Sequence, residues 1–161
     1  MKNIQVKNMI LAALGICLVF AATSIIKIPN GLQGYFNCGD GVILAFATLI
    51  NPIYAFCIGG IGSALADIAG GYASYALFTL LIKGLEGVIV AYLYHKHANS
   101  FFTFAIAVLW MIAGYVIADA FVNQSIILGL AAIPSNILQG IVGILLGKML
   151  VPIIHSAYKE A

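Results

Sequence analysis

Six apolar segments follow one another along the chain, separated by short stretches that are polar or rich in glycine and proline. The segments run approximately over residues 8–26, 40–50, 53–69, 74–94, 101–120 and 134–154. A helix needs about 20 apolar residues to cross the hydrocarbon layer of a membrane. The pattern therefore predicts an all-α integral membrane protein with six transmembrane helices, the second of them short.

The connections between these segments differ in length and polarity. The loop over residues 29–40 is long and mixes glycines with aromatic and amide side chains, and the connection over residues 95–100 is the most polar one and is expected to be solvated. Residues 126–133 are expected to form a short interfacial piece, with Pro134 in the first turn of the last helix. No internal repeat divides the chain, so we expect residues 1–161 to form a single transmembrane domain.

The composition agrees with a membrane protein. Hydrophobic residues make up 63% of the chain and charged residues only 7%, whereas a soluble domain carries roughly 25% charged residues. The chain is thus expected to be a multi-pass protein of the plasma membrane, with no room for a soluble catalytic or ATP-binding domain. It contains no arginine, the preferred bidentate partner of phosphate, which disfavours nucleic acid and highly phosphorylated ligands.

The lysines indicate the orientation of the helices in the membrane. Six crossings place both termini on the same side, and most lysines fall at the terminal side or between the fourth and fifth segments: Lys2, Lys7, Lys96, Lys148 and Lys159. Lys27 falls on the opposite side. By the positive-inside rule, both termini are cytoplasmic.

The fourth segment carries ionisable side chains where a membrane helix usually has none. Lys83 and Glu86 lie about 12–17 Å below its outer end at a rise of 1.5 Å per residue, and their spacing places them on one helix face. Tyr75 and Thr79 continue that face at four-residue steps. A charge at membrane depth is costly, so it faces a protein interior or a wet cavity and pairs there. Either this stripe meets something polar, or Lys83 and Glu86 only neutralise each other.

Other polar residues are expected at a similar depth in the outer half of the membrane. The candidate substrate-binding residues are Lys83, Glu86, Asn136, Gln139, Asn37, Tyr35, Thr79, Tyr115 and Asp67. Each also has a structural explanation: Asp67 as a cap or ion-pair partner, Tyr115 as an interfacial anchor, and Asn37 as a brace within its loop. Asp119 is as well explained by a solvated helix end as by a site.

A one-sided polar cluster is typical of a binding pocket that opens to the outside. A stand-alone secondary transporter or channel, the main alternative, needs polar groups along its whole path. An enzyme needs a nucleophile with its base, or a metal site, and the three histidines lie at the cytoplasmic ends while the three cysteines show no metal-binding spacing. We therefore expect neither catalytic residues nor a metal.

Small residues recur at four-residue steps on the first segment, at Ala13, Cys17 and Ala21. Such a stripe lets helices approach closely. It is explained either by packing within the protein or by a smooth surface on which another membrane subunit docks.

Three motifs resemble the substrate-binding S components of energy-coupling factor (ECF) vitamin transporters. They are YFNCGD at residues 35–40, GGIGSALAD at 59–67 and TLLIKGLEG at 79–87, and the similarity covers essentially the whole chain. The third motif is most similar to the group assigned to hydroxymethylpyrimidine or pyridoxine-type vitamins. S components for riboflavin, pantothenate or thiamine are the alternatives within the family.

The resemblance implies a protein without catalysis or a cofactor of its own. It would capture a vitamin or precursor from outside, beneath the first outer loop, and then join a transmembrane coupling subunit and two ATPase subunits that use ATP. The S component topples in the membrane and releases its substrate inward. The family's small-residue AxxxA motif on the first helix, which meets the coupling subunit, corresponds here to Ala13 and Cys17, with Ala21 one step on.

A small heterocycle needs aromatic faces and a few fixed polar groups. Tyr35, Tyr75, Tyr115 or Trp110 would supply the faces. Glu86 would meet a ring N–H, and Lys83 a hydroxyl or a phenolate-like oxygen.

Overall fold

The computed structural model describes residues 2–29, 34–97 and 100–160. Part of the expected loop over residues 29–40, namely residues 30–33, lies outside the described residues, as do residues 98–99 of the expected polar connection. The elements are α1 (Lys2–Ile25), β1 (Ile28–Pro29), β2 (Tyr35–Phe36), α2 (Gly39–Ala47), α3 (Pro52–Phe56), η1 (Cys57–Ile61), α4 (Gly62–Ala69), α5 (Ala76–His97), α6 (Ser100–Val122), α7 (Ile126–Ala131) and α8 (Ile133–Glu160).

The predicted all-α membrane fold is confirmed. Within the described residues, five helical stretches are long and apolar enough to cross a membrane: α1, the run α3–η1–α4, α5, α6, and the run α7–α8. The second predicted segment is α2, which has nine residues, all but Val42 of them buried. A helix buried on all sides needs no lipid-facing length, because its neighbours cover it.

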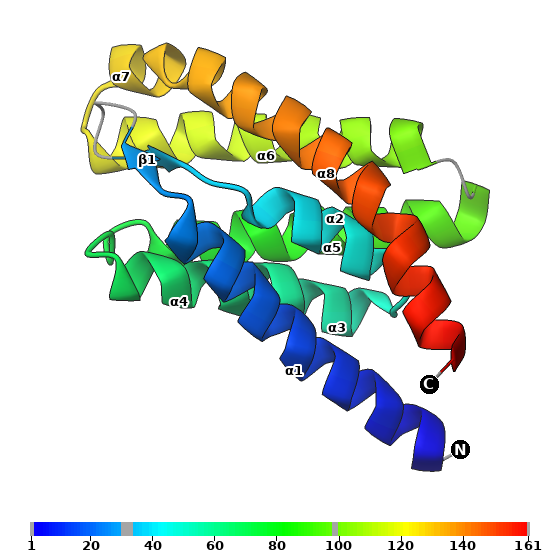
Figure 1. Cartoon of the computed structure of the whole chain (residues 1–161). Coiled ribbons are helices and arrows are strands. Elements are labelled where there is room, and N and C mark those ends of the chain that lie inside the picture. Colours follow the sequence, from blue (N-terminus) through cyan, green and yellow to red (C-terminus); the bar gives the residue numbers. More distant parts are fainter. Residues whose placement is uncertain (1, 30–33, 98–99, 161) are drawn as a thin grey trace.

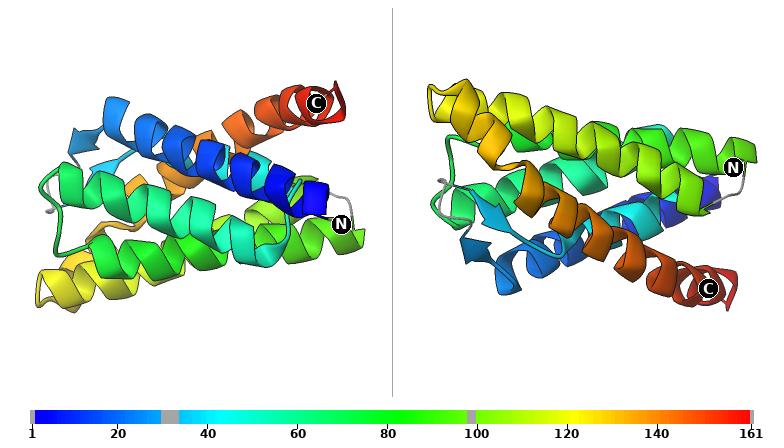
Figure 2. Two further views of the ribbon diagram at one scale, coloured as in Figure 1. Left: turned by 90° about the horizontal axis from the view of Figure 1, so that it is seen from below. Right: turned by 90° about the horizontal axis from the view of Figure 1, so that it is seen from above.

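The helices form a bundle with distinct ends (Figure 1). The start of α1, the end of α8, the end of α5 and the start of α6 lie at one end, while the antiparallel pair β1–β2 and the α6–α7 turn lie at the other. The short helix α2 packs against α8, α1 and α5, and α8 crosses the bundle obliquely over it (Figure 2). We refer to the end with β1 and β2 as the outer end.

Several helices are longer than the sequence pattern predicts. Helix α1 begins at Lys2 rather than near residue 8, and α8 continues to Glu160 rather than ending near residue 154. Helix α5 continues to His97, so residues 95–97 are helical and not part of a solvated loop. The reason is that a change in polarity marks the membrane boundary, whereas a helix can continue into water. His95 Nε2 also lies 3.2 Å from the carbonyl oxygen of Ile50.

Close backbone packing brings η1 against α5. The segment η1 is a single π-helical turn between α3 and α4, a local irregularity that is frequent at functional sites. A Cβ added at Gly60 would lie 2.6 Å from the carbonyl oxygen of Leu80, so only glycine allows this approach. This close packing positions the polar face of α5 inside the bundle.

Candidate functional site

The polar stripe of α5 faces the interior, as its spacing predicts. Lys83 and Glu86 are 1% and 0% exposed, whereas Leu77 and Leu81 on the opposite face are 68% and 49% exposed. Tyr75, which immediately precedes α5, and Thr79 within it are also buried. The leucines supply the lipid-facing surface, and the stripe supplies a polar interior.

Lys83 is held by two carboxylates. Its Nζ forms an ion pair and a hydrogen bond with Asp40, and it lies 3.3 Å from Glu86 Oε2. Asp40 is fully buried in the first turn of α2, where the free N–H groups of a helix N-terminus favour a negative charge. The predicted pair of Lys83 and Glu86 is thus a cluster of three charges, and Asp40 was not among the predicted site residues.

Gln139 connects this cluster to the loop that precedes α2. Its Nε2 donates to Asp40 Oδ2 at 2.9 Å, and its Oε1 accepts from the backbone N–H and the side-chain amide of Asn37 at 3.0 and 3.2 Å. Asn37 Oδ1 in turn accepts from the backbone N–H of Gly39 at 2.9 Å. Both residues are buried, so the amide of Gln139 fixes the start of α2 against α8.

A glycine of α8 makes room for this arrangement. A Cβ added at Gly143 would lie 2.7 Å from Cβ of Asp40, closer than real Cβ contacts. The close contact between α2 and α8 therefore depends on the missing side chain at this position.

A second polar layer lies toward the outer end. Asp67 in α4 is buried and accepts a hydrogen bond from the hydroxyl of Tyr35 in β2. Burial and the neighbouring Asp67 carboxylate raise the pKa of the Tyr35 hydroxyl well above its usual value. Thr79 Oγ1 lies 3.1 Å from the Tyr115 hydroxyl. The strand β2 therefore covers the polar interior with an aromatic ring anchored by its hydroxyl.

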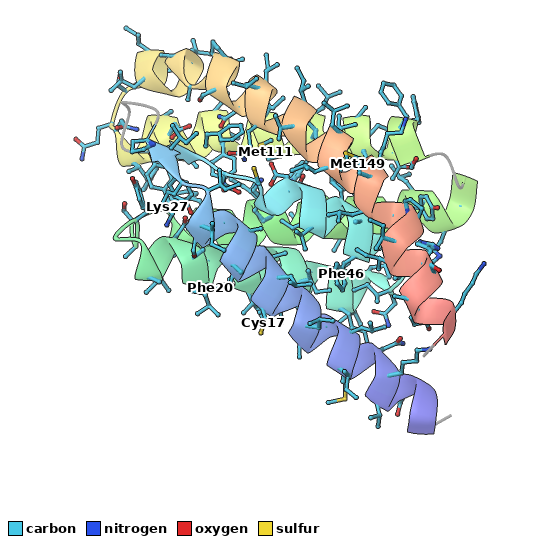
Figure 3. All side chains as sticks on the ribbon, in the orientation of Figure 1. Cys17, Phe20, Lys27, Phe46, Met111 and Met149 are labelled. Atoms are coloured by element: carbon cyan, nitrogen blue, oxygen red, sulfur yellow. The ribbon has the colours of Figure 1, made fainter. Side chains whose placement is uncertain are left out.

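Lys27 lies over this aromatic cover. Its Nζ is 4.5 Å from the ring centroid of Tyr35 and 5.4 Å from that of Tyr72, and it donates to the carbonyl oxygen of Ala66 at 3.2 Å. The two tyrosine rings are 4.6 Å apart. These contacts connect the end of α1 to the end of α4 across β2; Lys27 is labelled at the outer end in Figure 3.

Asp119 is part of the interior rather than a solvated helix end. It is 3% exposed, and its Oδ1 accepts a hydrogen bond from the Tyr75 hydroxyl at 2.8 Å. Asn123 donates to the Tyr75 hydroxyl at 3.2 Å. Its burial excludes the explanation of Asp119 as a solvated helix end.

These side chains enclose a narrow cavity of about 30 Å³, room for about two water molecules. Eight of the nine predicted binding residues line it, and Glu86 lies directly behind Lys83. The lining also includes residues that the sequence did not single out for the site. The full lining is Thr23, Gly34, Tyr35, Asn37, Ser63, Asp67, Tyr72, Tyr75, Thr79, Lys83, Tyr115, Asp119, Asn136 and Gln139.

The expectation that Trp110 offers an aromatic face to this site is wrong. Trp110 is 39% exposed, and its indole N–H donates to the carbonyl oxygen of Ile82 at 3.1 Å. Its ring therefore lies at the lipid-facing border between α5 and α6, not in the lining of the cavity.

The small-residue stripe of α1 lies mainly on the outside of the bundle. Ala13 and Cys17 are exposed and Ala21 is half-buried. Figure 3 shows Cys17 pointing away from the other helices. Leu14 and Leu18 on the same side are 50% and 42% exposed, so the stripe belongs to an apolar outer surface.

The fold and the cavity define a multi-pass membrane protein with a small polar site between its helices. A family model for the S component of ECF-type riboflavin transporters matches residues 3–158. The chain therefore belongs to the S-component family of ECF-type transporters, which are integral proteins of the plasma membrane and transporters rather than enzymes.

Two curated relatives span most of the chain. A thiamine precursor transporter, HmpT, from Lactococcus lactis subsp. cremoris (strain MG1363) is 30% identical over 159 residues, covering 96% of this chain and 92% of the relative. An uncharacterized protein in a gap 3′ region of Pyrococcus woesei is 36% identical over 135 residues, covering 80% of this chain and 88% of the relative.

Proposed function

We propose that this chain is the high-affinity substrate-binding subunit of an ECF-type importer for a small water-soluble vitamin or vitamin precursor. The observation that carries the proposal is Lys83, a fully buried lysine that lines a polar cavity and is held between Asp40 and Glu86. Such a costly group deep in a membrane protein marks a functional site by default.

The lining suits a small heterocycle. Lys83 and Asn136 offer N–H donors, Asp67 offers acceptors, and Tyr35 and Tyr115 offer ring faces. Glu86 is not part of the lining, but its carboxylate lies 3.3 Å from the Lys83 ammonium group. Glu86 would take a ring N–H and Lys83 a hydroxyl or phenolate-like oxygen, while Asn37, Gln139 and Thr79 would orient the contacting groups.

A heterocycle is larger than the present cavity, so binding requires movement. The covering residue Tyr35 is attached through its hydroxyl to Asp67 and through its ring to Lys27 and Tyr72. We propose that the segment 34–37 is a lid that lifts when the Tyr35–Asp67 hydrogen bond opens, and that it closes again over the substrate.

A hydroxymethylpyrimidine or pyridoxine-like substrate is favoured. The similarity to the thiamine precursor transporter supports this choice. The riboflavin family model keeps riboflavin as an alternative; thiamine and pantothenate are further ones.

Transport would depend on partner subunits. The exposed stripe of Ala13, Cys17 and Ala21 would dock on a transmembrane coupling subunit, and two ATPase subunits would supply the energy that topples the S component. A stand-alone transporter or channel is less well supported, because buried apolar side chains such as Leu44, Val90 and Phe104 fill the core outside the cavity lining.

A ligand screen on the purified protein tests the proposal. Each B vitamin and precursor is added at saturating concentration and thermal unfolding is followed; a ligand at 1,000 times its Kd stabilises the folded state by about 4 kcal/mol. One clear hit that Lys83→Ala or Glu86→Ala abolishes is the expected result. Binding that survives both substitutions would contradict the assigned site, and the absence of any hit would contradict the proposed vitamin class.

A further inference from the structure

Negative charge is concentrated around the cavity. The chain has five acidic residues, and four of them are buried at this site: Asp40, Asp67, Glu86 and Asp119. Among the described residues, the ammonium groups nearest to them are those of Lys83 and Lys27. With all six groups ionised, four carboxylates against two ammonium groups leave a formal charge of −2.

Neither lysine is free to bind a ligand carboxylate or phosphate. Lys83 already contacts both Asp40 and Glu86, so a ligand carboxylate or phosphate would have to displace one of them and leave it buried without its counter-ion, which is strongly unfavourable. Lys27 lies outside the aromatic cover and is engaged with Ala66 and the two tyrosine rings.

A buried acceptor in the lining lacks a donor. Asp67 is 3% exposed, and its Oδ1 accepts from Tyr35. Its Oδ2 has no hydrogen-bond partner among the described residues. The nearby hydroxyl of Thr79 lies 3.1 Å from that of Tyr115, and either hydroxyl can donate in that pair. A buried carboxylate oxygen without a donor is costly, and a ligand N–H at this position would satisfy it.

We propose that the site selects neutral or cationic heterocycles that carry N–H donors and excludes carboxylated or phosphorylated ones, with Asp67 accepting a hydrogen bond from a ligand nitrogen. This selectivity rests on the proposed function and deepens it. It removes the anionic pantothenate from the alternative substrates and favours aminopyrimidines and related bases. Phosphorylation of such a substrate after uptake would prevent its return to the site.

A pair of ligands of equal shape tests the charge selectivity on the unmodified protein. The probes are 4-amino-2-methylpyrimidine-5-carboxamide and the corresponding 5-carboxylate, with 4-amino-5-hydroxymethyl-2-methylpyrimidine as reference, measured by calorimetry in detergent. The carboxylate should bind at least about 100-fold more weakly than the carboxamide, because like charges in a buried site repel strongly. Equal or tighter binding of the carboxylate would overturn the inference.

The same measurements distinguish a failure of the charge selectivity from a failure of the proposed function. If a vitamin stabilises the protein but the carboxylate binds as well as the carboxamide, the function stands and the selectivity is wrong. If none of the three pyrimidines and no vitamin binds, both are wrong.

An isosteric variant assigns the effect to Asp67. Asp67→Asn should reduce the preference for the carboxamide over the carboxylate at least about tenfold, since it removes one buried negative charge. Glu160→Gln removes the same charge from the last residue of α8 and is the matched control, which should leave the preference unchanged. An unchanged preference in Asp67→Asn, with thermal unfolding showing a folded protein, would contradict the role of Asp67.

Discussion

Asp40 and Lys83 form a buried ion pair between α2 and α5, although 43 positions separate them in the chain. Gln139 donates to the second oxygen of Asp40 at 2.9 Å, so one carboxylate connects α2, α5 and α8. The site is therefore a junction of three helices, and changes in the charge cluster should alter both folding and binding.

The lysine should be the most sensitive member of the cluster. Lys83→Met leaves Asp40 and Glu86 as two buried carboxylates without a cation, and we expect it to lower the free energy of unfolding by about 3–5 kcal/mol. Glu86→Gln keeps the pair of Lys83 and Asp40 and leaves the two charges balanced, so it should cost much less. Thermal or denaturant unfolding in detergent without ligand compares the two. A larger loss for Glu86→Gln would contradict the assigned roles of Asp40 and Glu86.

Gln139 should stabilise the protein through both ends of its amide. Gln139→Leu removes the donor to Asp40 and the acceptor for Asn37, leaving buried polar groups unpaired at a cost of about 1.5–3 kcal/mol. Gln139→Glu retains the acceptor but places a second negative charge against Asp40, so it should be at least as destabilising. Unfolding of both variants measures this. If the glutamate variant were as stable as the original protein, the donor role of Gln139 would be excluded.

Substitution of Gly143 should separate α2 from α8. An added Cβ would lie 2.7 Å from Cβ of Asp40, and such overpacking typically costs about 1–3 kcal/mol. Gly143→Ala should lower thermal stability and also weaken ligand binding, because Asp40 and hence Lys83 must shift. Leu145→Ala, at a position 59% exposed, is the control. Undiminished affinity in a destabilised Gly143→Ala protein would show that the position of α2 does not influence the site.

The sequence predicted the polar stripe of α5 because local spacing alone determines which residues share a helix face. It did not predict Asp40 as a site residue, since its contact with Lys83 depends on how α2 is enclosed between α5 and α8. In the polar lining, Ser63 shares a helix face with Asp67 at four-residue spacing, which is a signal in the sequence. Thr23 of α1 gave none, because a single hydroxyl in a membrane helix is as often found in ordinary packing.

The surroundings of Asp119 and Trp110 could not be predicted from the sequence, because they depend on contacts between helices. Position along α6 indicated that Asp119 could be solvated, but Tyr75, which immediately precedes α5, donates a hydrogen bond to its carboxylate. Trp110 was expected to face the ligand, yet it precedes the buried Met111 by one residue and so is rotated about 100° around the helix. The depth of a residue in the membrane can thus be predicted from its position along the sequence. Which residues of a helix face a neighbouring helix can be predicted only when the two faces of that helix differ in polarity.

The hydroxyl of Tyr35 should control how fast ligand enters and leaves. Tyr35→Phe removes the hydrogen bond to Asp67 while keeping the ring beneath Lys27, so the lid should open more often. We expect both the association and dissociation rates to increase severalfold, because the loss of one hydrogen bond lowers the free-energy barrier to lid opening by about 1 kcal/mol or more. Stopped-flow fluorescence of Trp110 can follow ligand binding and release, because the Trp110 indole N–H is hydrogen-bonded to the backbone carbonyl of Ile82, the residue before Lys83. Unchanged rates in both directions would exclude the lid role of this hydrogen bond.

The outer surface of α1 should be needed for transport but not for binding. Ala13→Trp adds a bulky ring to the exposed stripe, so it should block the close helix approach that small residues permit while leaving ligand affinity in detergent unchanged. Leu109→Trp, at a position on α6 that is 65% exposed, is the matched control. Co-purification with the coupling subunit and uptake of labelled substrate are measured for both variants. Normal assembly and uptake by Ala13→Trp would place the docking surface elsewhere on the protein, whereas loss of both with intact binding would assign it to this stripe.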